Sequence, residues 1–191
     1  MRIASFPAMR PAWLAALALF LQLPAAAQDP EREVLPEQRQ ALAFVSPTGL
    51  TPLGGKMLFS AFHIASGQEL WITDGSSAGT HMLKDIRPGF RGSFPAGQTL
   101  FKGYVYTTAT DGASGLELWR TDGTAAGTTR VIDLRPGEEG AMPSELTVFR
   151  DALYFVADDG KTGFQLWKTS GTAETTTRVS SIDAGPRAVT R

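Results

Sequence analysis

Apolar and polar residues alternate along this chain in short blocks. From residue 50 onward, apolar, aromatic and β-branched residues form runs of four to seven, and each run ends in a stretch rich in Gly or Asp. Such runs are typical of β-strands, and the stretches between them are typical of turns. The clearest segment predicts strands at 146–149, 152–157, 164–169 and 177–182. No 3.6-residue periodicity accompanies them, so the pattern predicts an all-β fold.

The pattern repeats with a fixed period. Trp71, Trp119 and Trp167 are 48 residues apart. Residues 50–97 and 98–145 align without a gap and share 21 of 48 residues, and a third unit starts at residue 146 and continues to 191. A fixed period of this size indicates tandem structural units, which together make a three-repeat β domain over 46–191.

Four short antiparallel strands in about 48 residues match one blade of a β-propeller. We therefore predict three propeller-like blades, with another all-β stack as the alternative. Propellers use about four to eight blades, because closing the ring protects the edge strands. Three units predict an incomplete ring, and the expected solutions are an open array, a chain that is part of a longer array, or self-association that closes the ring.

The first 27 residues have the features of a secretory signal peptide. Arg2 and Arg10 precede an apolar run over 12–23, which Pro24 ends before Ala25-Ala26-Ala27. The run is too short to span a bilayer, so we expect a chain exported to the periplasm or outside the cell, with no membrane insertion after cleavage. Residues 28–45 predict a flexible lead-in that holds either an extra strand or a short helix at 41–45.

Composition excludes several classes of chemistry. The chain has no cysteine, which excludes disulfides, thiol nucleophiles and Cys-zinc sites. Without residues 1–27 it has 16 basic and 19 acidic residues, a net charge of −3, with both signs interspersed. We therefore expect no nucleic-acid partner. The two histidines, His63 and His81, are not repeated in the other units, and no catalytic triad or carboxylate pair stands out.

The tryptophans and aspartates are the candidate site residues. We predict that Trp71, Trp119 and Trp167 pack between neighbouring blades, with a sugar-binding platform as the alternative. The aspartates lie in the turns after the second and third strands, where they either bond the local backbone or contact calcium. The calcium candidates are Asp158, Asp159, Asp111, Asp74 and Asp122.

Two further expectations concern the repeats. Asp85 and Asp133 lie two residues before Arg87 and Arg135, on the same face of a predicted strand, and should form local ion pairs. The third unit departs from the repeated pattern, with Gln165 for Glu, Ser170 for Asp and Thr175 for Gly. These departures predict a weak or unfinished end of the array.

The repeated string resembles a known family. Residues 117–124 read Glu-Leu-Trp-Arg-Thr-Asp-Gly-Thr, and residues 69–76 and 165–172 match this string with one and two replacements. Together with the following Ala-Gly-Thr, this string resembles the ELWxxDGT repeat family of bacterial exported proteins over about residues 50–180. The resemblance implies tandem β repeats in a large exported protein. It implies no established activity and no site residues.

These observations favour an exported non-enzymatic β-repeat protein that acts as a binding or structural scaffold for a periplasmic or extracellular ligand. Two alternatives remain. One is a glycan-active hydrolase on a propeller scaffold, which would rest on fold analogy. The other is a calcium-stabilised adhesion module, whose melting temperature would rise with calcium.

Overall fold

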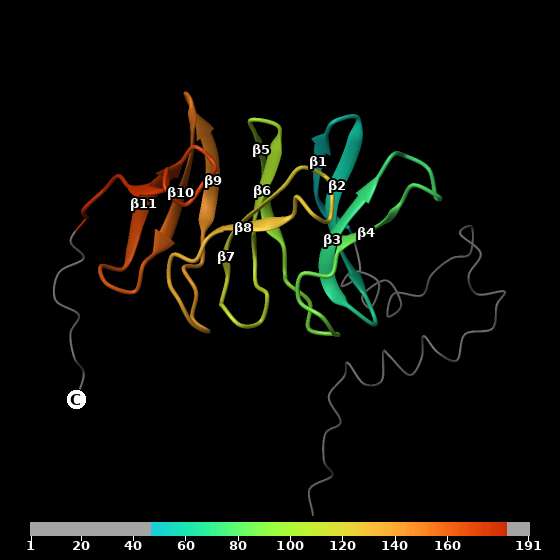
Figure 1. The fold of residues 1–191 in the computed structure, drawn as a ribbon, viewed down its shortest axis with the longest axis horizontal. Coiled ribbons are helices and arrows are strands. Elements are labelled where there is room, and N and C mark those ends of the chain that lie inside the picture. Colours follow the sequence, from blue (N-terminus) through green and yellow to red (C-terminus); the bar gives the residue numbers. More distant parts are fainter. Residues whose placement is uncertain (1–46, 183–191) are drawn as a thin grey trace, which may run out of the picture. The chain divides into compact units, whose positions relative to one another are not determined.

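The computed structural model describes residues 47–182, and these residues form strands and turns with no helix. The predicted signal peptide and lead-in lie outside the described residues. Three antiparallel sheets of four strands follow one another along the chain, as the 48-residue period predicts (Figure 1). The all-β prediction with four-stranded units is confirmed, whereas closure of a ring stays a prediction.

Each sheet keeps its strands in chain order. The first sheet consists of β1 (Thr48–Leu53), β2 (Lys56–His63), β3 (Gly67–Thr73) and β4 (His81–Lys84). The second consists of β5 (Ala96–Phe101), β6 (Tyr104–Ala109), β7 (Glu117–Thr121) and β8 (Thr129–Ile132). The third consists of β9 (Ser144–Phe149), β10 (Ala152–Asp158), β11 (Phe164–Thr169) and β12 (Thr177–Arg178).

The sheets are neighbours through their first strands and through two apolar clusters. Strand β5 contacts both β1 and β9. One cluster joins Leu58 and Leu70 of the first sheet to Val105 and Trp119 of the second. The other joins Tyr106 and Leu118 of the second sheet to Phe155 and Trp167 of the third. The second sheet is therefore buried on both faces, which explains why residues 105–109 of β6 are all buried despite the two-residue alternation of a strand.

The fourth strand of the third sheet is shorter than predicted. We expected 177–182, but pairing with β11 stops at Arg178. The N–H groups of Val179 and Ser180 both point at the carbonyl oxygen of Leu166, at 2.7 and 3.3 Å. Two successive donors on one acceptor break the regular ladder. The same irregularity lies between Leu118 and Trp119 of the second sheet, so it belongs to the repeat.

Candidate functional site

A polar cleft of about 320 Å³ lies where the first sheet meets the second, which we call the first boundary. Arg87 and Arg91 come from the loop after β4, and Thr110, Gly112 and Ser114 come from the turn after β6. Hydrogen bonds fix the backbone of the loop after β4 and of the turn after β6. The cleft is the candidate functional site because it gathers two guanidinium groups.

A buried glutamate holds the loop that carries the two arginines. The carboxylate of Glu69 is fully buried and accepts the N–H groups of Ile86 and Arg87, each at 3.1 Å. It also accepts the hydroxyl of Ser93 at 2.6 Å. Glu69 is the first letter of the repeated Glu-Leu-Trp string. The string therefore shapes the loop on which Arg87 and Arg91 stand.

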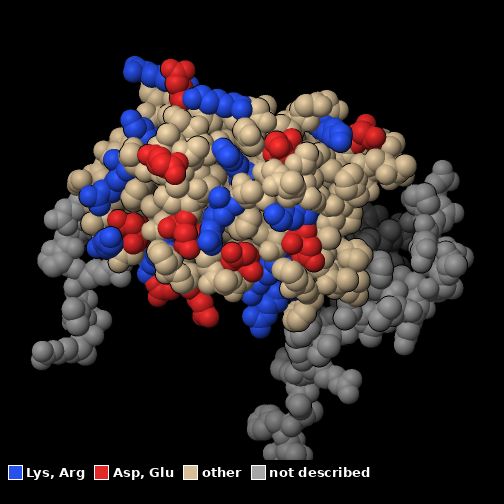
Figure 2. Space-filling view, viewed as in Figure 1, with Lys and Arg blue, Asp and Glu red and all other residues tan. Residues whose placement is uncertain are grey.

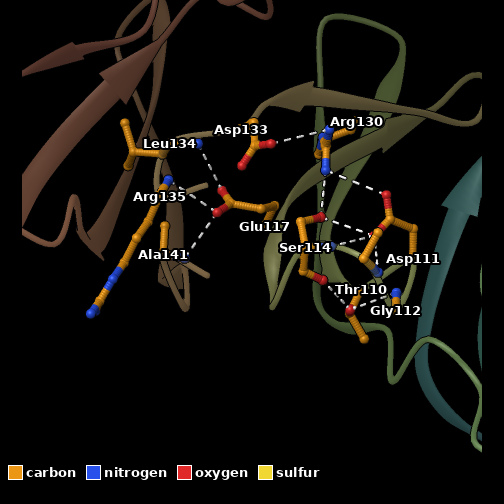
Figure 3. A network of polar contacts seen from close by, with 11 residues as sticks. Thr110, Asp111, Gly112, Ser114, Glu117, Arg130, Asp133, Leu134, Arg135 and Ala141 are labelled. Atoms are coloured by element: carbon orange, nitrogen blue, oxygen red, sulfur yellow. Dashed lines mark hydrogen bonds and ion pairs between the residues drawn. The ribbon is translucent and has the colours of Figure 1, made fainter. Parts of the chain in front are cut away.

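Glu117 does the same in the second unit, as Figure 3 shows. Its carboxylate accepts the N–H groups of Leu134, Arg135 and Ala141 at 3.1, 3.2 and 3.0 Å. Burial raises the pKa of the Glu117 carboxyl above its ordinary value, against the effect of the three donors. Burial likewise raises the pKa of Glu69.

The opposite wall of the cleft is the turn of residues 110–115. Thr110 donates its hydroxyl to the carbonyl of Ser114 at 2.5 Å and accepts the N–H of Gly112 at 3.0 Å (Figure 3). Asp111 accepts the N–H of Ser114 at 2.8 Å and forms an ion pair with Arg130 at 3.4 Å. Asp111 therefore already has a cationic partner within its own sheet.

At the second boundary, between the second and third sheets, acidic side chains pair with the arginine, and the first boundary has no such pairs among the residues described. At the second boundary Arg135, the counterpart of Arg87, forms ion pairs with Asp158 at 2.9 Å and with Glu139. The residues 48 positions earlier are Thr110, which is neutral, and Arg91, which is basic. Among residues 47–182, no acidic side chain forms an ion pair with Arg87 or Arg91. The first boundary thus leaves two guanidinium groups without an ion pair in the described segment, whereas the second pairs its arginine, and Glu138 also lines the cleft.

Each of the two equivalent arginines, Arg87 and Arg135, packs closely against a glycine of the next unit. A Cβ placed on Gly112 would lie 2.8 Å from Nε of Arg87, and one on Gly160 would lie 3.0 Å from Nε of Arg135. Both glycines have positive φ, 87° and 76°. The glycines of the Asp-Gly turns thus leave space for the arginine side chain of the preceding unit. The sequence analysis did not anticipate this role.

Beyond the cleft, charges of both signs are interspersed over the face shown in Figure 2. The expected local ion pair of Asp133 with Arg135 is wrong. Asp133 pairs with Arg130 at 3.3 Å, because Arg135 extends across the boundary to Asp158. Asp85 and Arg87 form no ion pair either within the described part of the chain.

The five calcium candidates lie in four turns, with Asp158 and Asp159 adjacent in one of them, and accept local hydrogen bonds. Asp158 accepts the N–H of Gly160, and Asp159 accepts those of Lys161 and Thr162. Within residues 47–182, no three His, Cys, Asp or Glu side chains gather closely enough to hold a metal ion. Calcium binding by Asp158, Asp159, Asp111, Asp74 or Asp122 stays a prediction, and it would have to displace these bonds.

The Asp-Gly-Thr turn is closed by its own side chains. Asp122 accepts the N–H and the hydroxyl of Thr124 at 2.9 and 2.7 Å, and Thr121 accepts the N–H of Gly123 at 3.1 Å. The hydrogen bonds from Thr124 hold the pKa of the Asp122 carboxyl below its ordinary value. Asp74 has the same arrangement with Ser76, with the same lowering of its pKa.

In the third unit, a different side chain closes the equivalent turn. A Cβ on Gly127 would lie 2.1 Å from Oδ1 of Asp122, so a side chain there excludes the carboxylate. The third unit has Thr175 at the glycine position and Ser170 at the aspartate position. Thr175 Oγ1 then accepts the N–H groups of Thr172 and Ser170 at 3.1 and 3.2 Å.

Gln165 stands where the earlier units have Glu69 and Glu117, and it still binds the backbone of the loop that follows. It is buried, accepts the N–H of Ile182 at 2.8 Å and donates to the carbonyl of the same residue at 2.7 Å. Ile182 is the counterpart of Leu134 and Ile86. Other hydrogen bonds therefore compensate for the departures at Gln165, Ser170 and Thr175, and the expectation of a weak or unfinished end of the array stays a prediction.

The three tryptophans occupy equivalent strand positions with different surroundings. Trp119 lies in the cluster between the first and second sheets, and Trp167 lies in the cluster between the second and third. Each therefore faces the preceding sheet. Trp71 is only partly buried, and its ring centroid lies 6.3 Å from that of His63.

The functional candidates that sequence reasoning missed are Glu69, Glu117, Thr110 and Arg91. A signal for the last two was present in the aligned units, where Asp158 and Glu139 stand opposite Thr110 and Arg91. Only the structure shows that these positions meet across a boundary.

No helix in the described segment is long and apolar enough to cross a membrane. No protein-family model matches the chain, and no curated protein sequence matches it.

Proposed function

We propose that the chain is an exported, non-enzymatic β-repeat scaffold that binds an anionic ligand in the cleft at the first boundary. The proposal is carried by Arg87 and Arg91, which form no ion pair within the described residues, whereas Arg135, the counterpart of Arg87, pairs with Asp158 and with Glu139, the counterpart of Arg91. The repeat string does not supply the binding groups, since Glu69 and Asp74 are occupied by local hydrogen bonds. Export rests on the signal-like residues 1–27, and the family resemblance stays a prediction.

The ligand class follows from guanidinium chemistry. A guanidinium offers planar pairs of donors that match carboxylate and sulfate oxygens. The backbone of the 110–115 turn adds polar groups to the wall, whereas the Ser114 hydroxyl already donates to Asp111 and accepts from Arg130. A cleft of about 320 Å³ is at the small end of ligand sites. We therefore propose that it holds one acidic sugar residue of a polysaccharide, through its carboxylate or sulfate ester.

Titration calorimetry with oligogalacturonate tests the proposal. Arg87→Ala and Arg91→Ala should each weaken binding about tenfold or more, because each removes a charge-assisted contact worth about 1.5–3 kcal/mol. Arg178→Ala is the matched control, since Arg178 is exposed on the third sheet and outside the cleft. Binding should also weaken as salt is added.

A neutral oligosaccharide of the same length shows whether charge is the cause. The proposal predicts no measurable binding of that sugar. It would be overturned by equal binding of both sugars, by arginine variants that bind as well as the unmodified chain, or by cleavage of either sugar during incubation. Cleavage would instead support the alternative of a glycan-active hydrolase.

A further inference from the structure

The outer face of the third sheet has a hollow of about 270 Å³. Phe149, Tyr154 and Lys168 contribute to its lining. Phe149 is 55% exposed, whereas its counterpart in the second sheet, Phe101, is 5% exposed. Phe149 and Tyr154 pack edge to face, with ring centroids 5.9 Å apart. The hollow is therefore an ordered, partly apolar surface.

The same hollow in the second sheet is filled by the third. Tyr106 and Arg120, the counterparts of Tyr154 and Lys168, meet Gly171 of the turn after β11. Arg120 Nη1 donates to the carbonyl of Gly171 at 2.8 Å. A Cβ on Gly171 would lie 2.5 Å from the hydroxyl oxygen of Tyr106, so only glycine fits.

The first boundary repeats this contact. Gly123, the counterpart of Gly171, lies against the first sheet, where a Cβ on it would be 3.3 Å from Leu53 and 3.4 Å from Ile72. At both boundaries, the glycine of the later unit enters the hollow of the earlier one. The contact is thus a property of the repeat, used twice within the described segment.

The first sheet carries the matching glycine without a contact of this kind. Gly75 is exposed, and a Cβ on it would meet no atom within 4 Å. Its φ of 93° is close to the 90° of Gly123, so its turn already has the docking conformation. Trp71 stands on the same side of the first sheet as Trp119 does on the second.

We propose that the third sheet of one copy binds the first sheet of a second copy, with Gly75 of the second copy in the hollow of Phe149, Tyr154 and Lys168. Lys168 then donates to the carbonyl of Gly75, as Arg120 does to that of Gly171. Two copies joined by two such contacts bring six sheets together, which is within the usual range for closed propellers. A head-to-tail contact of this kind closes a ring when its rotation allows, and otherwise extends an array.

Sedimentation velocity on the purified chain, at concentrations up to about 100 μM, tests this contact. We expect a concentration-dependent species of twice the monomer mass. Gly75→Ala should weaken association at least tenfold, because its Cβ would meet the hydroxyl of Tyr154. Lys168→Ala should weaken it as well, although Lys168 is exposed and its removal leaves the monomer intact.

Two controls separate association from folding. Gly137→Ala imposes similar backbone strain, since Gly137 has a φ of 102° and open space around it, but it lies away from the contact. Lys161→Ala removes another exposed lysine of the third sheet. Both should associate like the unmodified chain. Longer arrays that Gly75→Ala abolishes would also support the contact. A monomer at every concentration, or association that Gly75→Ala leaves intact, would overturn it.

Discussion

At the residue scale, the central group is the buried carboxyl group of Glu117. Glu117 has no exposed surface and accepts three backbone N–H groups of the loop after β8. A neutral amide has one oxygen and cannot accept all three donors. Gln165 is tolerated in the third unit because the carbonyl of Ile182 accepts its amide N–H. The partners of the side chain, not its charge alone, decide which residue fits.

The raised pKa of Glu117 sets a pH dependence. The folded chain binds the Glu117 proton more tightly than the unfolded chain, so this group favours folding below its ordinary pKa of 4.5. That contribution is lost as pH rises through the raised pKa of the folded state. Glu117→Gln removes the titration. The free-energy difference between the unmodified chain and this variant should therefore be larger at pH 4 than at pH 7.

Urea unfolding at both pH values measures this difference, with Glu145→Gln as the control because Glu145 is exposed. The control should show the same difference at both pH values. A stability advantage of the unmodified chain that grows towards pH 7 would mean that the carboxylate form is favoured, and would contradict the stated direction.

At the element scale, the apolar runs and turn residues predict most of the fold. The strands expected at 152–157 and 164–169 are Ala152–Asp158 and Phe164–Thr169. Local alternation is sufficient for these because each strand pairs with its chain neighbour. It fails for the arginines, since Arg135 meets an aspartate 23 residues away on the next sheet. Contacts across a boundary leave no local pattern in the sequence.

The turn of the third unit gives a prediction at the same scale. Ser170→Asp alone should destabilise the chain, because the carboxylate would meet the side chain of Thr175, as Asp122 would meet any Cβ on Gly127. Adding Thr175→Gly recreates the turn of the second unit and should restore stability. The double-mutant cycle should therefore show a coupling of about 0.5–3 kcal/mol.

Thermal unfolding of the two single variants and the double variant measures the coupling. Ser180→Asp with Thr175→Gly is a useful control pair, because Ser180 lies outside this turn. Additive effects of Ser170→Asp and Thr175→Gly would show that the two positions do not constrain each other, and would contradict the compensation seen in the structure.

At the scale of the described segment, the repeat supplies the three-sheet framework, and the departures from it supply the candidate site. The carboxylates of the repeated string hold loops and turns. The sequence analysis offered local backbone bonding as one alternative for the aspartates, but it did not single out Glu69 and Glu117. The candidate site arises where Thr110 and Arg91 replace the acids of the next unit. The sequence contains this difference, but its meaning depends on which residues face each other across a boundary.

The most direct test of this account converts the first boundary into the second. Thr110→Asp places an acid where Asp158 stands, next to a glycine N–H that it can accept and within reach of Arg87. We predict that calorimetry of this variant with oligogalacturonate shows binding at least about tenfold weaker, with the melting temperature retained. Undiminished binding by a folded Thr110→Asp chain would contradict the assignment of the cleft as the ligand site.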